Sequence, residues 1–80
     1  MQVRLLLFAQ FRDLAGTDQV ELHVHDGATV GEVVAQLRAD ARWRALPATP
    51  AVAVNRSYAP LSTRLADGDE LALIPPVAGG

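Results

Sequence analysis

The chain has 80 residues, of which 50% are hydrophobic and 20% are charged, with a net charge of −2 and no cysteine. This composition indicates one small globular domain, and it excludes disulfides, thiol redox chemistry and cysteine-based metal sites. Acidic and basic residues are interspersed, so no electrostatic footprint for nucleic acid is present, and the apolar N-terminal stretch is too short for a membrane span. We therefore expect a cytoplasmic protein that binds neither nucleic acid nor membrane.

The first quarter of the chain predicts a β-hairpin. Residues 3–11 alternate in a way that predicts a strand with one wholly apolar face, so Leu5 and Leu7 point to the core and Phe8 to the opposite face. Residues 13–18 predict the turn of the hairpin. Residues 20–24 alternate between apolar and polar side chains, which predicts a second strand with one solvated face.

A helix is expected next. Thr29 and Glu32 have the spacing of a capping box, with Thr29 as the N-cap. The helix should end before Pro47, and Trp43 should cover the core near that end. Four apolar residues fall on one helical face: Val30, Val33, Val34 and Leu37.

The second half of the chain predicts two strands, at residues 51–54 and 70–74, separated by an irregular segment over residues 55–65. The order strand, strand, helix, strand, strand places one helix on one face of a sheet, with the first and last strands side by side. The predicted fold class is therefore α+β, a ubiquitin-like β-grasp with a mixed sheet packed on one main helix.

The last six residues have the features of a functional tail. The two prolines favour a stiff, extended stem, and the residues after them are small or lack a Cβ, so the end of the chain can thread a narrow channel. We expect a β-grasp domain over residues 1–76 and an extended, flexible tail over residues 77–80. The reactive carboxylate is expected on Gly80. The residues expected to thread the channel are Pro75, Pro76, Val77, Ala78 and Gly79.

The β-grasp order and this tail together resemble those of the molybdopterin synthase small-subunit family. The members of this family are sulfur carriers. The matching segments are residues 7–16, 53–55 and 65–71, the last running into the tail. The resemblance implies that a partner adenylyltransferase consumes ATP to adenylate the carboxylate of Gly80, and that sulfur then converts it to a thiocarboxylate. The thiocarboxylate would donate sulfur to a pterin precursor in molybdenum cofactor biosynthesis.

The resemblance also implies the partners. The chain would be the sulfur-donating subunit of a sulfurtransferase, in a heterotetramer with the large subunit of molybdopterin synthase. The catalytic side chains and any bound nucleotide would belong to that large subunit and to the E1-like adenylyltransferase, so we expect no cofactor and no metal on this chain.

The surface that partners contact is predicted from strand parity. Phe8 and Ile74 should share the open face of the sheet, with Tyr58 nearby, in an exposed apolar patch beside the tail. Arg12 and Arg64 are expected to flank this patch as rim charges. His23 and His25 should share the face of the second strand as a solvated pair, because Glu21 is the only further ligand type near them on that face.

Three alternatives remain open at the level of the sequence. The chain could be a sulfur carrier for thiazole synthesis or tRNA thiolation, or a ubiquitin-like modifier whose Gly80 forms an amide with a lysine of a target protein. It could also be a β-grasp interaction module with an inert tail. The Pro-Pro stem and the length of the chain favour the molybdopterin branch.

Overall fold

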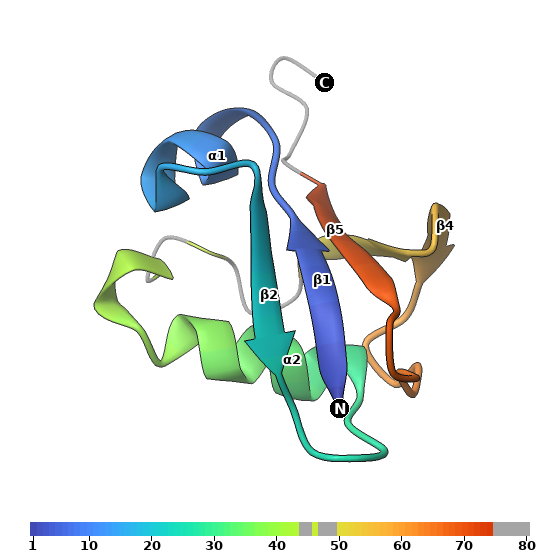
Figure 1. Ribbon diagram of the computed structural model, residues 1–80. Coiled ribbons are helices and arrows are strands. Elements are labelled where there is room, and N and C mark those ends of the chain that lie inside the picture. The colour runs from blue at the N-terminus through green and yellow to red at the C-terminus, as the bar shows by residue number, and fades with distance from the viewer. Residues whose placement is uncertain (44–45, 47–49, 75–80) are drawn as a thin grey trace.

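The computed structural model describes residues 1–43, 46 and 50–74 of the chain, without the side chain of residue 42. These residues form a five-stranded sheet with one longer helix across one of its faces (Figure 1). The sheet has the strand order β2-β1-β5-β3-β4. The strands are β1 (Gln2–Leu6), β2 (Gln19–His23), β3 (Ala51–Val54), β4 (Ser57–Ala59) and β5 (Glu70–Ile74), and the helices are α1 (Ala9–Ala15), α2 (Val30–Arg38) and the 3₁₀ helix η1 (Ala41–Trp43).

The two central strands confirm the predicted β-grasp. β1 and β5 pair in parallel, with Leu5 opposite Leu71, whereas every other strand pair is antiparallel. Because β1 and β5 run in the same direction, both end at the same edge of the sheet, next to α1 (Figure 1). This arrangement brings the connection from β1 to α1 close to the end of β5, where the tail begins.

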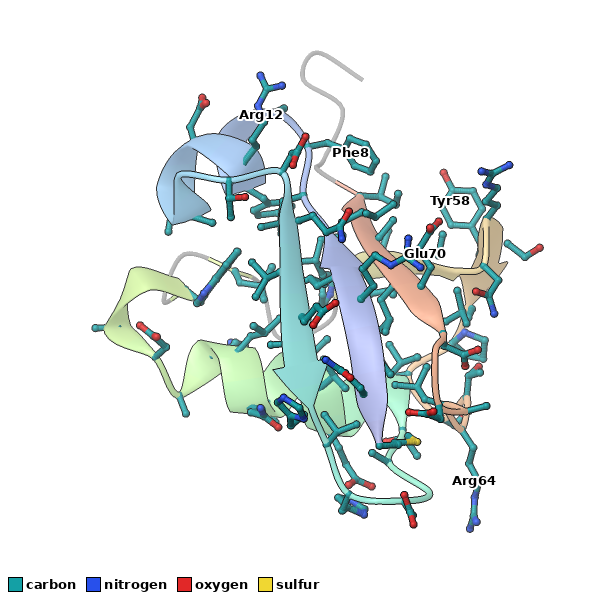
Figure 2. The ribbon with its side chains drawn as sticks, in the orientation of Figure 1. Phe8, Arg12, Tyr58, Arg64 and Glu70 are labelled. Atoms are coloured by element: carbon teal, nitrogen blue, oxygen red, sulfur yellow. The ribbon has the colours of Figure 1, made fainter. Side chains whose placement is uncertain are left out.

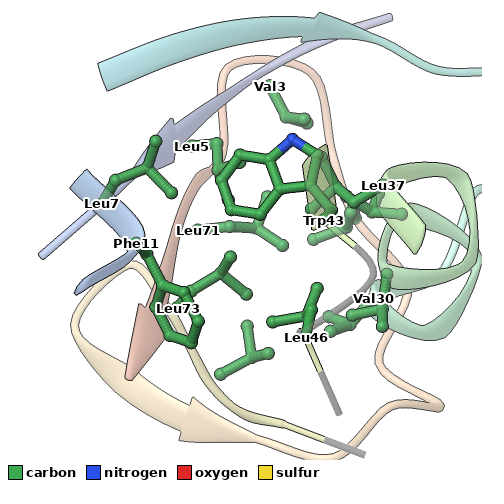
Figure 3. Close-up of a cluster of buried hydrophobic side chains, with 14 residues drawn as sticks. Val3, Leu5, Leu7, Phe11, Val30, Leu37, Trp43, Leu46, Leu71 and Leu73 are labelled. Atoms are coloured by element: carbon green, nitrogen blue, oxygen red, sulfur yellow. The ribbon is translucent and has the colours of Figure 1, made fainter. Parts of the chain in front are cut away.

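The core lies between the sheet and α2 (Figure 3). Alternate residues of the central strands point inward, among them Val3, Leu5 and Leu71, each no more than 1% exposed. Trp43 is 4% exposed and its ring centroid lies 6.5 Å from that of Phe11, so the predicted position of Trp43 over the core is confirmed. The buried face of α2 consists of the four predicted residues: Val30, Val33, Val34 and Leu37.

The predicted hairpin is confirmed, because β1 and β2 pair antiparallel, but the predicted first strand over residues 3–11 and the predicted turn over residues 13–18 are correct only in part. β1 ends at Leu6, and α1 occupies residues 9–15, with Gly16 in the left-handed conformation at its C-terminus. Leu7 and Phe11 are both buried, and a separation of four residues fits the inward positions of a strand as well as of a helix. Residues 4–15 contain no β-branched residue, which favours the helix.

The capped start of α2 is confirmed, but its end is earlier than the predicted limit at Pro47. The side chain of Thr29 accepts a hydrogen bond from the backbone N–H of Glu32 at 3.2 Å. The helix ends at Arg38 and the chain continues through η1. Six further residues of α-helix would place Trp43 about 240° around the axis from Leu37, away from the core. The 3₁₀ turn returns Trp43 to the buried side.

The predicted irregular segment over residues 55–65 contains β4. It pairs with β3 in an antiparallel hairpin, in which Val54 lies opposite Ser57 across the two-residue turn formed by Asn55 and Arg56. Both turn residues have positive φ, 49° and 73°, as in the type I′ turns that suit hairpins. The sequence gives little sign of this turn because the glycine that usually occupies the second position is absent.

Leu37 tests the assignment of the helix face. Its side chain is 7% exposed on the buried face of α2. Leu37→Ala is expected to lower the free energy of unfolding by about 2–5 kcal/mol, since it removes buried methyl groups and leaves a cavity. Chemical denaturation measures the change. The exposed Ala35 of the same helix provides the control, because Ala35→Ser should shift the midpoint far less; equal shifts would contradict the assignment.

Candidate functional site

The face of the sheet opposite α2 carries an apolar concavity of about 400 Å³. It extends along β5 from its first residue, Glu70, to its last, Ile74, and reaches the end of β1 at Leu6. Its lining comes from β1, β3, β4, β5 and two connecting segments: Leu6, Phe8, Ala53, Arg56, Tyr58, Glu70, Ala72 and Ile74.

One cross-strand row explains why the surface is hollow there. Leu6 on β1 is paired with Ala72 on β5, Ala72 with Ala53 on β3, and Ala53 with Tyr58 on β4. Paired residues of neighbouring strands place their side chains on the same face. The two alanines at the centre of the row therefore form a low floor, and larger side chains rise at both of its ends.

Phe8 forms one wall of the apolar concavity. It is the N-cap of α1, with extended φ and ψ of −124° and 154°, and the chain turns at Ala9, whose φ is 47°. Because of this turn Leu7 is buried, at 1% exposed, whereas Phe8 remains 47% exposed. The outward position predicted for Phe8 is correct, although the residue lies beyond the strand that was expected to contain it.

Tyr58 forms the opposite wall and is 77% exposed (Figure 2). Together with Phe8 and the partly buried Ile74, it makes an exposed apolar surface at the point where β5 leads into the tail. The structure thus brings together the three apolar residues predicted for the interface. Their role in binding a partner stays a prediction.

The two arginines expected at the rim do not line the apolar concavity. Arg12 lies on α1, on the side of Phe8, whereas Arg64 projects from the opposite end of the molecule (Figure 2). The backbone of Arg64 forms a bridge with Thr29 at the start of α2, so the prediction that Arg64 flanks the patch is wrong. Residues 55–65 fold back through β4 before reaching that end, a path that the sequence did not reveal.

Sequence reasoning missed several lining residues, of which Arg56 and Glu70 carry charge. Glu70 is the first residue of β5 and lies 3.9 Å from the guanidinium of Arg4, across the parallel pair. Strand parity with Ala72 and Ile74 was sufficient to place Glu70 on this face. Arg56 could not be found in this way, because its position depends on the β3–β4 turn.

The predicted tail, including the threading residues and Gly80, lies outside the described residues, as does the predicted boundary at residue 76. What the structure does show is where the described chain ends. Ile74 is the last residue of β5, paired with Ala51 of β3 and lining the apolar concavity. A partner that covers the apolar concavity would therefore contact the domain directly beside residue 75.

The two histidines lie on or beside β2, and the described residues contain no group of three or more His, Cys, Asp or Glu side chains that could hold a metal ion. His25 instead bonds the carboxylate of Glu32 on α2 through Nε2, while Nδ1 lies 3.0 Å from the carbonyl oxygen of Asp26. The hydrogen bond with Glu32, then the carbonyl of Asp26, raises the pKa of His25. The same bond with His25 lowers the pKa of Glu32.

The His25–Glu32 pair predicts a small pH dependence of stability. A raised His25 pKa stabilises the fold fully below the ordinary value of 6.5, and this contribution is lost as pH rises through the raised value. A lowered Glu32 pKa stabilises the fold above the ordinary value of 4.5, and this is lost as pH falls through the lowered value. The melting temperature of His25→Gln should therefore fall furthest below wild type at about pH 5–6. A constant difference from pH 4 to about pH 9 would contradict this.

Within the described part of the chain, no helix has both the length and the apolar character needed to cross a bilayer.

Comparison with known proteins gives a consistent result. The ThiS family model matches residues 5–80. The molybdopterin synthase sulfur carrier subunit of Mycobacterium tuberculosis is 43% identical over 82 residues, which cover 100% of this chain and 99% of that protein. The crystal structure of SAMP1 from Haloferax volcanii superposes with a TM-score of 0.84 at 34% identity, covering 100% of both chains.

A further solved structure contains two kinds of chain. It is the protein–protein complex of subunits 1 and 2 of the molybdopterin-converting factor from Helicobacter pylori 26695, and one of its chains superposes with a TM-score of 0.74 at 26% identity, covering 100% of both chains. These similarities confirm the predicted fold and the predicted resemblance to the small-subunit family.

Proposed function

Because the chain belongs to the ThiS family, we propose that it is the sulfur carrier subunit of a molybdopterin synthase. The observation that carries this proposal is its 43% identity, over its whole length, to a molybdopterin synthase sulfur carrier subunit. In this function the folded domain provides the surface that a partner binds, and the tail carries the reacting group. The chain acts as one part of an enzyme complex, a sulfurtransferase.

The proposed chemistry takes place at the carboxylate of Gly80. A carboxylate resists nucleophilic attack, so an adenylyltransferase first joins it to the α-phosphate of ATP, releasing pyrophosphate and giving an acyl adenylate. A sulfur nucleophile then attacks the carbonyl carbon, AMP leaves, and a thiocarboxylate remains. Its sulfur is anionic and soft at neutral pH, so it is a far better nucleophile than a carboxylate, by the same logic that makes a thiolate reactive.

The proposed partner in sulfur transfer is the large subunit of the synthase, in a heterotetramer. A complex of two such subunits exists for the structurally similar protein from Helicobacter pylori, which supports a large-subunit partner. The apolar concavity is the proposed docking face, because Phe8 and Tyr58 are the most exposed aromatic side chains in the described part of the chain, and aromatic residues are enriched at interfaces. The domain would hold no nucleotide or metal of its own, and use of ATP by its partner is consistent with action in the cytoplasm.

A second function, that of a protein modifier, is favoured by one observation. A chain named for a small archaeal modifier protein, SAMP1, superposes on this one with a TM-score of 0.84 at 34% identity. In that function the activated Gly80 is attacked by a lysine amine of a target protein, which forms an amide and also releases AMP. Activation is the same in both functions, and only the acceptor differs.

Reconstitution distinguishes the two functions. The chain is incubated with ATP, a sulfide source and the adenylyltransferase, and its intact mass is measured. A sulfur carrier gains the mass difference between sulfur and oxygen, and then supports pterin conversion when the large subunit is added. Formation of lysine-linked conjugates without sulfur loading would refute the sulfur-carrier function in favour of the modifier.

A further inference from the structure

The turn between β3 and β4 holds a charged residue in an unfavourable backbone conformation at the edge of the apolar concavity. Arg56 is the second residue of this turn, and its φ is 73°. Residues with a Cβ are disfavoured in this region, and glycine is the preferred residue at this position of a type I′ turn. Arg56 therefore destabilises the hairpin locally. Glycine would suit this backbone conformation better, but it would not provide a guanidinium group.

Hydrogen bonds from Asn55 fix the turn in place. Its Nδ2 donates to Oδ1 of Asp69 at 3.0 Å, and its Oδ1 accepts from the backbone N–H of Glu70 at 3.0 Å. The backbone N–H of Asn55 also donates to the carbonyl oxygen of Glu70 at 2.8 Å. These three bonds tie the turn to the start of β5, so the backbone of Arg56 has a defined position relative to the sheet.

The guanidinium of Arg56 has no ion pair with the acidic residues described on this part of the sheet. Glu70 is the acidic residue that also lines the apolar concavity, and its carboxylate lies 3.9 Å from Arg4. Arg56 is exposed, and no ion pair of its guanidinium occurs among the described residues. An exposed cation therefore lies beside an apolar surface that includes the aromatic side chains of Phe8 and Tyr58.

We propose that Arg56 determines partner specificity at the apolar concavity by pairing with a carboxylate of the protein that covers it. The inference rests on the proposed function, which makes that protein the large subunit of the synthase. The surface of the large subunit that would fit this site is an apolar protrusion, which fills the hollow above Ala53 and Ala72 and has an Asp or Glu side chain next to it. Arginine suits this role because its guanidinium presents a planar pair of donors to a carboxylate.

The expected effect is kinetic. A charge at the edge of an interface steers the partner during encounter, so it changes the association rate and its salt dependence more than the dissociation rate. Arg56→Gln should slow association with the large subunit several-fold at low ionic strength. The difference from wild type should shrink as salt is added, because screening weakens the attraction.

The test measures association and dissociation rates with the purified large subunit, at low and at high salt, for the wild-type chain and for Arg56→Gln. Arg64→Gln is the matched control, because it removes the same charge from a residue that does not line the apolar concavity. Arg56→Gly is the third variant. It should melt at a higher temperature than wild type, since it relieves the unfavourable φ, and yet associate as slowly as Arg56→Gln.

Wild-type rates for Arg56→Gln would overturn the inference, as would equal slowing by Arg64→Gln, which would indicate an effect of net charge alone. Slowed capture by the adenylyltransferase with unchanged binding to the large subunit would also overturn it. Failure of the wild-type chain to bind the large subunit would refute the proposed function, and the inference with it. Binding by wild type with unchanged rates for the variant would refute only the role of Arg56.

Discussion

Removal of Gly80 is expected to abolish sulfur transfer while the domain melts as wild type does. The proposed reacting group is the carboxylate of Gly80, and deletion withdraws it by about 3.3–3.6 Å, the length of one extended residue. Since displacement of a reacting group by 1 Å can reduce a rate about 100-fold, a shift of this size should leave no measurable turnover. Addition of one residue after Gly80 should be equally damaging for the same reason.

The measurement follows pterin conversion by the large subunit, with the carrier supplied already as a thiocarboxylate. Chemical loading bypasses the adenylyltransferase, so a loss of turnover then reports sulfur transfer itself and not failed activation. Asp13→Asn, an exposed change on α1 away from the apolar concavity, is the control that should transfer sulfur normally. Normal turnover by the loaded deletion variant would mean that the end of the chain is not the reacting group. The interaction module with an inert tail predicts that result.

The elements that the sequence predicted correctly are those with a clear apolar pattern. β2 and β5 alternate in burial, β3 is a short apolar run, and α2 has both an N-cap and four apolar residues on one face. In each of them the conformational preference of the residues and their burial favour the same structure. The sequence pattern of the segment was therefore sufficient to predict the element. The pairing of the first and last strands then followed from the crossover rule.

α1 was missed because the spacing between its buried residue, Phe11, and the buried Leu7 before it fits two periods at once. Leu7 and Phe11 are both buried, and their separation of four residues belongs to a strand and to a helix alike. Two signals favoured the helix: the lack of β-branched residues, and Gly16, which ends α1 with φ of 74° and donates its N–H to the carbonyl oxygen of Arg12. Helical preference and the cap decided the structure over a segment where the apolar pattern was ambiguous.

The apolar concavity was predictable only in part. Phe8 and Ile74 follow from strand parity, which is a local property. The hollow itself depends on Ala53 and Ala72 being neighbours in the sheet, and this required the register of β3 against β5. Arg56 required the turn as well. Residues placed by tertiary pairing, and not by their own segment, are the ones that the sequence could not identify.

The second large effect separates the inward side chain of Leu7 from the outward side chain of Phe8. Leu7 is 1% exposed, so Leu7→Arg places a charge in the core without a partner, which costs several kcal/mol. A domain of this size has only about 5–15 kcal/mol of total stability, so we expect Leu7→Arg to be unfolded. Phe8 is 47% exposed, and Phe8→Arg should remain folded because the new charge stays in water.

Phe8→Arg should nevertheless bind the large subunit poorly, because docking would press a charge into an apolar interface and remove an aromatic contact. A central aromatic residue of an interface contributes 2 kcal/mol or more, so the expected loss of affinity is about 30-fold or greater. Leu14→Arg is the matched control. It introduces the same charge at an apolar residue that is 37% exposed and lies on α1, outside the apolar concavity, so it should fold and bind as wild type does.

Circular dichroism melts and binding to the large subunit give four distinguishable results. An unfolded Phe8→Arg together with a folded Leu7→Arg would mean that the chain enters α1 with the two side chains exchanged. A folded Phe8→Arg with undiminished binding would keep the fold and move the docking surface away from the apolar concavity. Equal losses for Phe8→Arg and Leu14→Arg would show that added positive charge, and not contact with Phe8, weakens the complex. Only weak binding by Phe8→Arg, with normal binding by Leu14→Arg, fits docking at the face from which β5 leads into the tail.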